Sequence, residues 1–255
     1  LPGSGKIRPK LVDGEEKLKG RYVGGGHRQD HDAYDIYREI SSPTANVSSV
    51  LAVIANASRK GLKIMTLDIG QAYLNAEITD ETIVMKIDHE ILQLLKIVDP
   101  ETDYNEFVEI DKAGRETGYV KLNKALYGLI QSARIWYNHL RKVMLKYGYV
   151  PNEYDPCIFN KTNNDGEIIS TGCFHVDDGL ITAISEELLD ELERDLKREF
   201  NNDVKIKRGL LHEYLGMKLD FTVKNKCHVT QQKFIMDLIK NWNITKGRDT
   251  PARPN

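Results

Sequence analysis

The chain has 255 residues, of which 40% are hydrophobic and 29% charged, and its formal net charge is only −2. This hydrophobic content excludes an intrinsically disordered chain, and no apolar run in the sequence approaches the ~20 residues that span a bilayer. Three widely spaced cysteines without a CxxC pair indicate a reducing, intracellular setting. Because the first residue is Leu1 and not Met, we expect a piece of a longer protein with one large or two small domains.

The small net charge conceals alternating acidic and basic segments. Residues 77–118 carry twelve acidic and four basic side chains, whereas residues 119–147 carry six basic and no acidic ones. Residues 1–28 and 201–255 are also net basic. Solvated faces would explain any one of these segments, but three basic segments in a neutral chain favour a groove that binds a polyanion.

The first half of the chain predicts a hairpin, helices and strands. An Asp13-Gly14 turn joins strands at 6–12 and 15–23, and a loop runs from 24 to 35. Next come a helix that opens at 43–44 and ends at Gly61, strands at 62–69 and 83–87, a short helix around 91–95, and a polar, acidic stretch over 99–118. The apolar spacing of the first helix, at Val47, Val50, Leu51 and Ile54, predicts one buried face.

The second half continues the alternation. It predicts a strand at 119–122, a turn at Gly128 and an amphipathic helix over 131–147. Strands at 157–159 and 168–184 follow, the second with a tight turn at 177–178, and then a helix over 186–200. Short strands near 204, 214–221 and 227–229 precede a last helix over 231–242 and a linker from 243 to 255. Antiparallel hairpins beside helices in this order predict an α+β fold, with a split βαβ sheet and helices on one face.

Three carboxylates interrupt otherwise apolar strands. Asp68 stands at the end of one strand, and Asp177 and Asp178 stand at the tip of a hairpin. Asp-Asp-Gly is a good turn sequence, and turn chemistry alone would explain the pair. The cost of burying like charges favours a compensating cation instead. Mg²⁺ prefers oxygen ligands, and two such ions about 3.5–4 Å apart serve displacement at phosphorus.

Several sequence blocks resemble, in order, those of the reverse transcriptases of copia-type LTR retrotransposons. The most specific block is KLNKALYGLIQSARIWY at 121–137. The others are DIGQAYLN at 68–75, YDPC at 154–157, VDD at 176–178, YLG at 214–216 and TQQKFI at 230–235. The resemblance covers about residues 6–242 and implies a fragment of a Pol polyprotein with a right-hand polymerase fold, in which the split βαβ sheet is the palm.

The resemblance also implies domain limits and an activity. It places fingers at 1–43 and 76–130, the palm at 44–75 and 131–228, and the start of a thumb with a linker at 229–255. The implied enzyme is an RNA-directed DNA polymerase, a nucleotidyltransferase that adds dNTPs to a primer 3′-hydroxyl on an RNA or DNA template.

Individual residues take roles from the same resemblance. Asp68, Asp177 and Asp178 would be catalytic and hold two Mg²⁺ ions, which Mn²⁺ could replace, with the carbonyl of Ile69 as an extra ligand. Tyr73 would be the steric gate that excludes a 2′-hydroxyl. The other implied nucleotide-binding residues are Lys19, Arg21, Gly70, Gln71, Ala72, Tyr127, Gly128 and Gln131. The implied primer and template contacts are His175, Val176, Tyr214, Leu215 and Gly216.

The implied partners are an RNA template, a DNA primer, an RNA–DNA hybrid and dNTPs, with no membrane and an open oligomeric state. The expected location is the cytoplasm, inside a virus-like particle, or the nucleus, or both.

Three departures from the family pattern leave alternatives open. His175 stands where the family usually has Tyr, Ala133 where it has Pro, and Ile130 where it has Lys. One alternative is a domesticated domain that binds nucleic acid with little or no turnover. Another is a different palm-domain enzyme, such as an RNA polymerase or a nucleotidyl cyclase, although Tyr73 argues against it because those enzymes must admit a 2′-hydroxyl.

Overall fold

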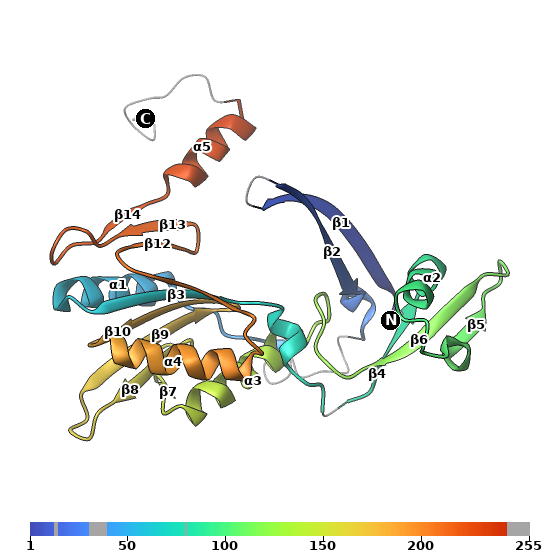
Figure 1. The fold of residues 1–255 in the computed structure, drawn as a ribbon, viewed down its shortest axis with the longest axis horizontal. Coiled ribbons are helices and arrows are strands. Elements are labelled where there is room, and N and C mark those ends of the chain that lie inside the picture. Colours follow the sequence, from blue (N-terminus) through green and yellow to red (C-terminus); the bar gives the residue numbers. More distant parts are fainter. Residues whose placement is uncertain (13–14, 31–39, 80, 244–255) are drawn as a thin grey trace, which may run out of the picture. The chain divides into compact units, whose positions relative to one another are not determined.

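The chain divides into two compact units, each built from two separate stretches of sequence. A computed structural model describes residues 1–12, 15–30, 40–79 and 81–243, and for 6–12 and 15–19 it describes the backbone alone. The first unit comprises Leu1–Thr44 and Gly70–Gly148, and the second comprises Ala45–Ile69 and Tyr149–Asn255. Figure 1 labels the elements in chain order. No helix among the described residues is long and apolar enough to cross a membrane.

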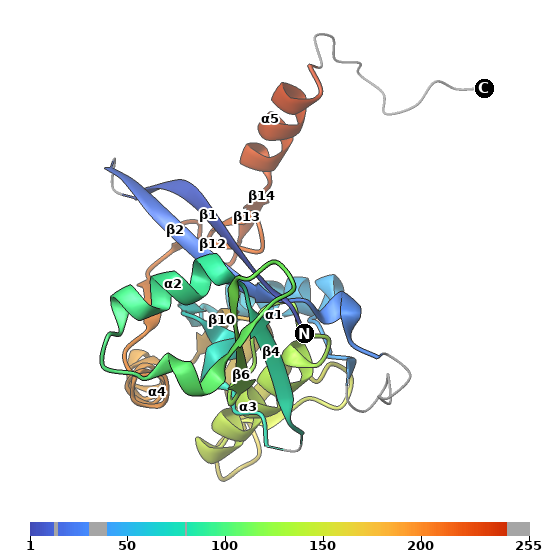
Figure 2. The same cartoon turned by 90° about the vertical axis from the view of Figure 1, so that its right-hand side faces the viewer.

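The first unit contains two antiparallel sheets. Its elements are β1 (Gly3–Val12), β2 (Glu15–Gly24), η1 (Gly26–Arg28), η4 (Ala72–Asn75), β4 (Ile83–Ile87), α2 (His89–Val98), η5 (Tyr104–Phe107), β5 (Val108–Ile110), β6 (Glu116–Leu122) and α3 (Ser132–Lys146). Strands β1 and β2 pair with each other, and β4, β6 and β5 form a sheet in that order. Helix α2, whose N-terminus is capped by Asp88, packs against β6 (Figure 2).

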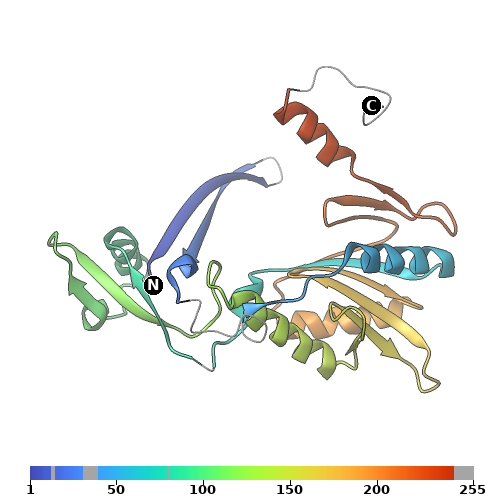
Figure 3. The same cartoon turned by 180° about the vertical axis from the view of Figure 1, so that it is seen from behind.

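The second unit is built on a six-stranded antiparallel sheet. Its elements are α1 (Val47–Lys60), β3 (Lys63–Ile69), β7 (Val150–Pro151), β8 (Ile158–Thr162), β9 (Ile168–His175), β10 (Asp178–Ala183), α4 (Glu186–Glu199), β11 (Val204–Arg208), β12 (Leu211–Tyr214), β13 (Met217–Asp220), β14 (His228–Thr230) and α5 (Gln232–Asn241). The large sheet has the order β11-β3-β10-β9-β8-β7, and β12, β13 and β14 form a smaller one. Figure 3 shows the smaller sheet and α5 from behind, in orange to red.

The core of the second unit centres on β10. The residues from Gly179 to Ala183 are all buried, as expected for an interior strand covered on both faces. Helix α4 packs on β3, β10 and β11 through Leu189, Leu192 and Leu196, whose three- and four-residue spacing puts them on one face. The apolar strands that carry the carboxylates are therefore held from several sides.

The mixed α and β composition with antiparallel sheets confirms the coarse α+β prediction, and most predicted elements are present. Three details were wrong. Helix α1 begins at Val47 and not at 43–44, because the Asn46 side chain accepts a hydrogen bond from the Ser48 amide and caps the helix there. Val47 and Leu51 are 66% and 44% exposed, so burial shifts to Val50, Ile54 and Ala57.

The segment 214–221 is a hairpin and not one strand. Leu215 and Gly216 have φ angles of 49° and 74°, and this pair of left-handed residues makes the two-residue turn between β12 and β13. The polar, acidic stretch over 99–118, for which no element was predicted, contains the short strand β5 and the start of β6. Parts of the predicted loop at 24–35 and of the linker at 243–255 lie outside the described residues.

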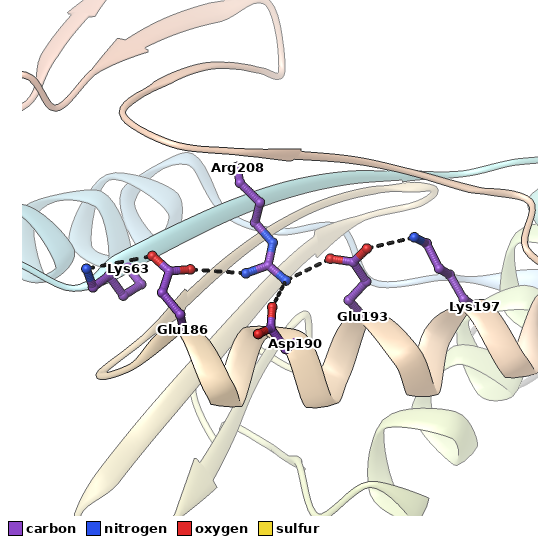
Figure 4. A network of polar contacts seen from close by, with 6 residues as sticks. All are labelled: Lys63, Glu186, Asp190, Glu193, Lys197 and Arg208. Carbon is purple, nitrogen blue, oxygen red and sulfur yellow. Dashed lines mark hydrogen bonds and ion pairs between the residues drawn. The ribbon is translucent and has the colours of Figure 1, made fainter.

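Arg208, the last residue of β11, binds three carboxylates of α4 (Figure 4). Its Nη2 lies 2.7 Å from Glu193 and 3.1 Å from Asp190, and its Nη1 lies 3.2 Å from Glu186. Lys197 also contacts Glu193 at 2.7 Å. The hydrogen bond from Lys197 and those from Arg208 lower the pKa of Glu193. The network fastens the edge strand β11 to the helix that covers the sheet.

We expect Arg208→Gln to lower the free energy of unfolding by about 1–3 kcal/mol, because three neighbouring carboxylates lose their shared cation. Urea denaturation measures the loss. Arg198→Gln is the matched control, since Arg198 makes an exposed pair with Asp195 and should contribute under ~1 kcal/mol.

The free energy of unfolding that Arg208→Gln removes should also depend on pH. Because the pKa of Glu193 is lowered in the folded state, its contribution is complete above the ordinary pKa of 4.5 and disappears as the pH falls through the lowered value. The difference between wild type and Arg208→Gln should therefore narrow in acid. Equal effects of the two substitutions at pH 7 would contradict this role for Arg208.

Candidate active site

Two of the three predicted catalytic carboxylates face each other across neighbouring strands. Asp178, the first residue of β10, pairs in register with Asp68 near the end of β3. The turn before Asp178 consists of Val176 and Asp177, because His175 pairs with Asp178. The Asp177 carbonyl accepts a hydrogen bond of 3.0 Å from the Ile69 amide, which ties the turn to β3.

Val176 has a φ of 60°, in the left-handed region that a β-branched residue rarely adopts. Such strain persists only where the surrounding structure holds it, and it is common at functional sites. Here the pairing of β10 with both β9 and β3 holds the turn.

Negative charge is concentrated at these strand ends. Burial raises the pKa of Asp178, and the charges of Asp177 and Asp68 raise it further, whereas His175 opposes the shift. Lys205 lies opposite Asp68 on β11, and its Nζ is 3.4 Å from the Asp68 carboxylate. Since Lys205 is largely exposed, it compensates the cluster only in part.

The donor set fits a hard divalent cation through its charge and its oxygen chemistry. Mg²⁺ typically takes one or two carboxylates and completes its shell with water and substrate phosphates, so the Asp68–Asp178 pair suffices as protein ligands. Among the described residues, no three Asp, Glu, His or Cys side chains gather into a ready metal-binding group. The roles of Asp68, Asp177, Asp178 and the Ile69 carbonyl as metal ligands therefore stay predictions.

His175 and the β12–β13 turn accompany the carboxylates in the second unit. His175 is half-buried, and its Nδ1 is buried without a hydrogen-bond partner among the described residues. Leu215 and Gly216 line a cavity of about 900 Å³ together with Asp68 and Asp178, and residues of α5 line it too. These two turn residues are predicted primer contacts, and they share the cavity with Asp68 and Asp178.

Tyr214 also borders this cavity, but it is 3% exposed and its hydroxyl donates a 3.0 Å hydrogen bond to the Cys173 carbonyl. Its polar end is therefore directed at backbone. His212, on the same strand as Tyr214, is buried as well. The sequence does not single out His212, because one histidine in a short alternating strand matches no motif.

The predicted nucleotide-binding residues lie in the first unit. Gly70 and Gln71 lead into η4, where Gln71 has a φ of 50° and the Asn75 side-chain amide donates to the Gly70 carbonyl at 3.0 Å. Ala72 is buried, and the half-buried Tyr73 ring lies 4.5 Å from the Tyr127 ring between centroids. The structure thus brings Tyr73 and Tyr127 together, although they are 54 positions apart in the sequence.

Glycines allow a close backbone contact beside Tyr127. The Gly26 amide donates to the Gly128 carbonyl at 3.0 Å, and the Gly24 amide donates to the Tyr127 carbonyl at 2.7 Å. A Cβ at Gly26 would collide with the Gly128 carbonyl, and Gly128 has a φ of 92° that favours glycine. Close backbone packing thus explains why glycine stands at positions 24 and 26.

Gln131 is buried and forms part of a polar chain inside the first unit. Its Nε2 donates to Glu81 at 2.6 Å, and its Oε1 accepts from Gln29 at 3.0 Å. Gln29 in turn accepts from the Ile130 amide. Gln131 is thus engaged with protein at both ends of its amide.

The two predicted phosphate-binding cations lie on β2. Arg21, which is exposed, pairs in register with Lys6, and Lys19 pairs with Arg8. The side chain of Lys19 lies outside what the structure describes. The cross-strand register therefore juxtaposes basic positions along this hairpin.

Comparison with known proteins gives one family. A family model described as reverse transcriptase (RNA-dependent DNA polymerase) matches residues 8–254. The retrovirus-related Pol polyprotein from transposon TNT 1-94 of Nicotiana tabacum is 28% identical over 240 residues, which are 92% of this chain and 16% of that protein. The corresponding polyprotein from transposon RE1 of Arabidopsis thaliana is 29% identical over 242 residues, 94% of this chain and 14% of that protein.

Among solved structures, an apo telomerase from Candida tropicalis, truncated from its C-terminal domain, covers 89% of this chain and 55% of its own, with a TM-score of 0.42 and 9% identity. The chain thus spans only a sixth to a seventh of the length of these two polyproteins. On the match over residues 8–254, the chain belongs to the reverse transcriptase (RNA-dependent DNA polymerase) family, as a reverse-transcriptase domain of the kind found in copia-type retrotransposon Pol polyproteins.

Proposed function

We propose that this chain is an RNA-directed DNA polymerase that adds dNTPs to a primer 3′-hydroxyl on an RNA or DNA template. The observation that carries the proposal is the register of Asp68 with Asp178 at the ends of buried strands, with Asp177 in the adjoining turn. A tight turn alone does not require three acidic residues at this point. Burial raises the pKa of Asp178, and repulsion from Asp177 and Asp68 raises it further. A bound divalent cation would compensate this repulsion between the carboxylates.

The strand order supports the assignment of the second unit to a palm. The motif consists of β3, β9, β10 and β11, which count as strands one to four in chain order. In the sheet these strands lie in the order β11, β3, β10, β9, which is four, one, three, two. This is the antiparallel arrangement of a split βαβ sheet. The proposed fingers, residues 1–43 and 76–130, fall within the first unit, and the proposed thumb begins near residue 229.

In this proposal Asp68, Asp177 and Asp178 hold two Mg²⁺ ions, for which Mn²⁺ can substitute. When bound, the ions lower the pKa of the primer hydroxyl and neutralise charge on the leaving pyrophosphate. The protein's own part is to hold the carboxylates in fixed register through β3 and β10. Arg21 and Lys19 supply further positive charge to the triphosphate.

Tyr73 is proposed to select deoxynucleotides. The neighbouring Tyr127 ring limits the movement of the Tyr73 ring, and a fixed aromatic wall leaves no room for a 2′-hydroxyl. Gly70, Gln71, Ala72 and Gly128 would form the rest of this pocket, largely through backbone groups.

The proposed partners are an RNA template, a DNA primer, their hybrid and dNTPs. Helix α3 exposes Arg141, Lys142 and Lys146, which are suited to contact a phosphate backbone. Such contacts give affinity without sequence preference, as a polymerase requires. Residues 119–147, which contain α3, carry no acidic side chain to oppose them.

We expect Asp178→Asn to abolish primer extension, because the substitution removes a charged ligand while keeping the side-chain shape. Extension of oligo(dT) on poly(rA) with Mg²⁺ or Mn²⁺ measures the activity. Asp165→Asn, in an exposed turn, should extend like wild type. A wild-type protein that makes no more product than Asp178→Asn would refute the proposed function.

We expect Tyr73→Ala to raise the incorporation of rNTPs relative to dNTPs by about tenfold or more, because the ring no longer blocks the 2′-hydroxyl. Competition between matched dNTP and rNTP in single-nucleotide extension measures the ratio. Tyr73→Phe keeps the ring and should keep the ratio. An unchanged ratio in Tyr73→Ala would remove Tyr73 from sugar selection.

A further inference from the structure

Strand β12 places two polar side chains in the core of the second unit. Its residues alternate between exposed and buried, and the buried positions are His212 and Tyr214, at 1% and 3% exposure. Since they are two residues apart in a strand, they lie on the same face. Buried polar groups are costly unless they are bonded, so their partners indicate what the strand is built to hold.

His212 binds the strand that carries Asp68. Its Nε2 lies 2.8 Å from the Gly209 carbonyl, which can only accept, so Nε2 carries the proton. Burial lowers the pKa of His212 and favours the neutral ring. The Nδ1 then accepts a hydrogen bond of 3.0 Å from the Thr66 hydroxyl on β3.

Tyr214 binds the strand that leads into the catalytic turn. Its hydroxyl donates to the Cys173 carbonyl on β9 at 3.0 Å. Burial raises the pKa of Tyr214, so the hydroxyl keeps its proton and remains a donor. One short strand is thus bonded to both β3 and β9, and these flank β10.

Both bonds end close to the carboxylates and to the cavity. Thr66 precedes Asp68 by two residues on β3, and Cys173 precedes His175, the partner of Asp178, by two residues on β9. Tyr214 itself directly precedes the Leu215–Gly216 turn, which lines the cavity with Asp68 and Asp178. The left-handed φ of Leu215 leaves this turn strained, so it depends on its anchors.

We infer that His212 and Tyr214 are positioning residues that hold the Leu215–Gly216 turn in register with Asp68 and Asp178, so that the turn places the primer 3′ end. The inference rests on the proposed polymerase function for its last step. Tyr214 acts through its bond to backbone, and the turn residues are those that meet the primer. Arg208 secures the other end of the β11–β12 corner by its contacts with α4.

Two substitutions test the bonds without opening the core. Tyr214→Phe removes one hydroxyl, and Thr66→Val removes the donor to His212 while keeping the shape of the side chain. Tyr149→Phe is the matched control: Tyr149 is 1% exposed, and its hydroxyl donates to Ser170 at 2.9 Å. Thr66→Ser restores the hydroxyl and should rescue.

Hydrogen exchange of backbone amides measures the positioning directly. We expect the amides of 217–219, which lie in the ladders that β13 makes with β12 and β14, to exchange about fivefold faster in Tyr214→Phe and Thr66→Val, the factor of one typical hydrogen bond. Tyr149→Phe and Thr66→Ser should leave them unchanged. Unchanged exchange in both test variants, or equal acceleration in Tyr149→Phe, would overturn the inference.

Primer extension with the 255-residue chain measures the consequence. We expect kcat to fall about fivefold or more in Tyr214→Phe and Thr66→Val, with little change in the KM for dNTP, because the primer end and not the nucleotide is displaced. A fall of the same size in Tyr149→Phe would show a merely structural role. If the wild type extends no primer, the proposed function fails, while the exchange data still decide whether the two bonds hold the turn.

Discussion

Like charges at the ends of buried antiparallel strands are the constraint on which the rest of the second unit depends. Asp68 and Asp178 are held opposite each other by the register of β3 and β10, and neither can move away without breaking the sheet. Burial and repulsion raise the pKa of Asp178, and Lys205 offsets the charge only in part. The sheet therefore keeps a site of unfavourable charge that a cation would relieve.

The surrounding elements brace this site from different sides. Arg208 fastens β11 to α4, so the edge strand that carries Lys205 is fixed by ion pairs. His212 and Tyr214 connect the hairpin of β12 and β13 to β3 and β9 by hydrogen bonds. Hydrogen bonds and ion pairs suit this positioning role because each hydrogen bond fixes a distance and an angle between two groups. Apolar packing alone would allow neighbouring strands to slide slightly past one another.

The first unit uses close backbone contact for a similar purpose. Gly26 and Gly128 let two chain segments approach until their amide and carbonyl groups bond, and the adjacent Tyr127 ring packs on Tyr73. Gln29, Gln131 and Glu81 complete the support from inside the unit. Gln131, which the sequence resemblance assigns to nucleotide binding, thus also supports the interior of this unit through its hydrogen bonds.

The sequence by itself determined the element types, the antiparallel α+β class and the three acidic positions, because periodicity, turn residues and misplaced charges are local signals. It also indicated the family, through the ordered blocks from Asp68 to Ile235. It could not locate the Leu215–Gly216 turn, since a leucine in left-handed backbone is imposed by strand pairing and not by its own preference. Only the tertiary structure decided that Asp68 meets Asp178 and that His212 reaches Thr66, 146 positions away, because such pairings depend on sheet register between distant segments.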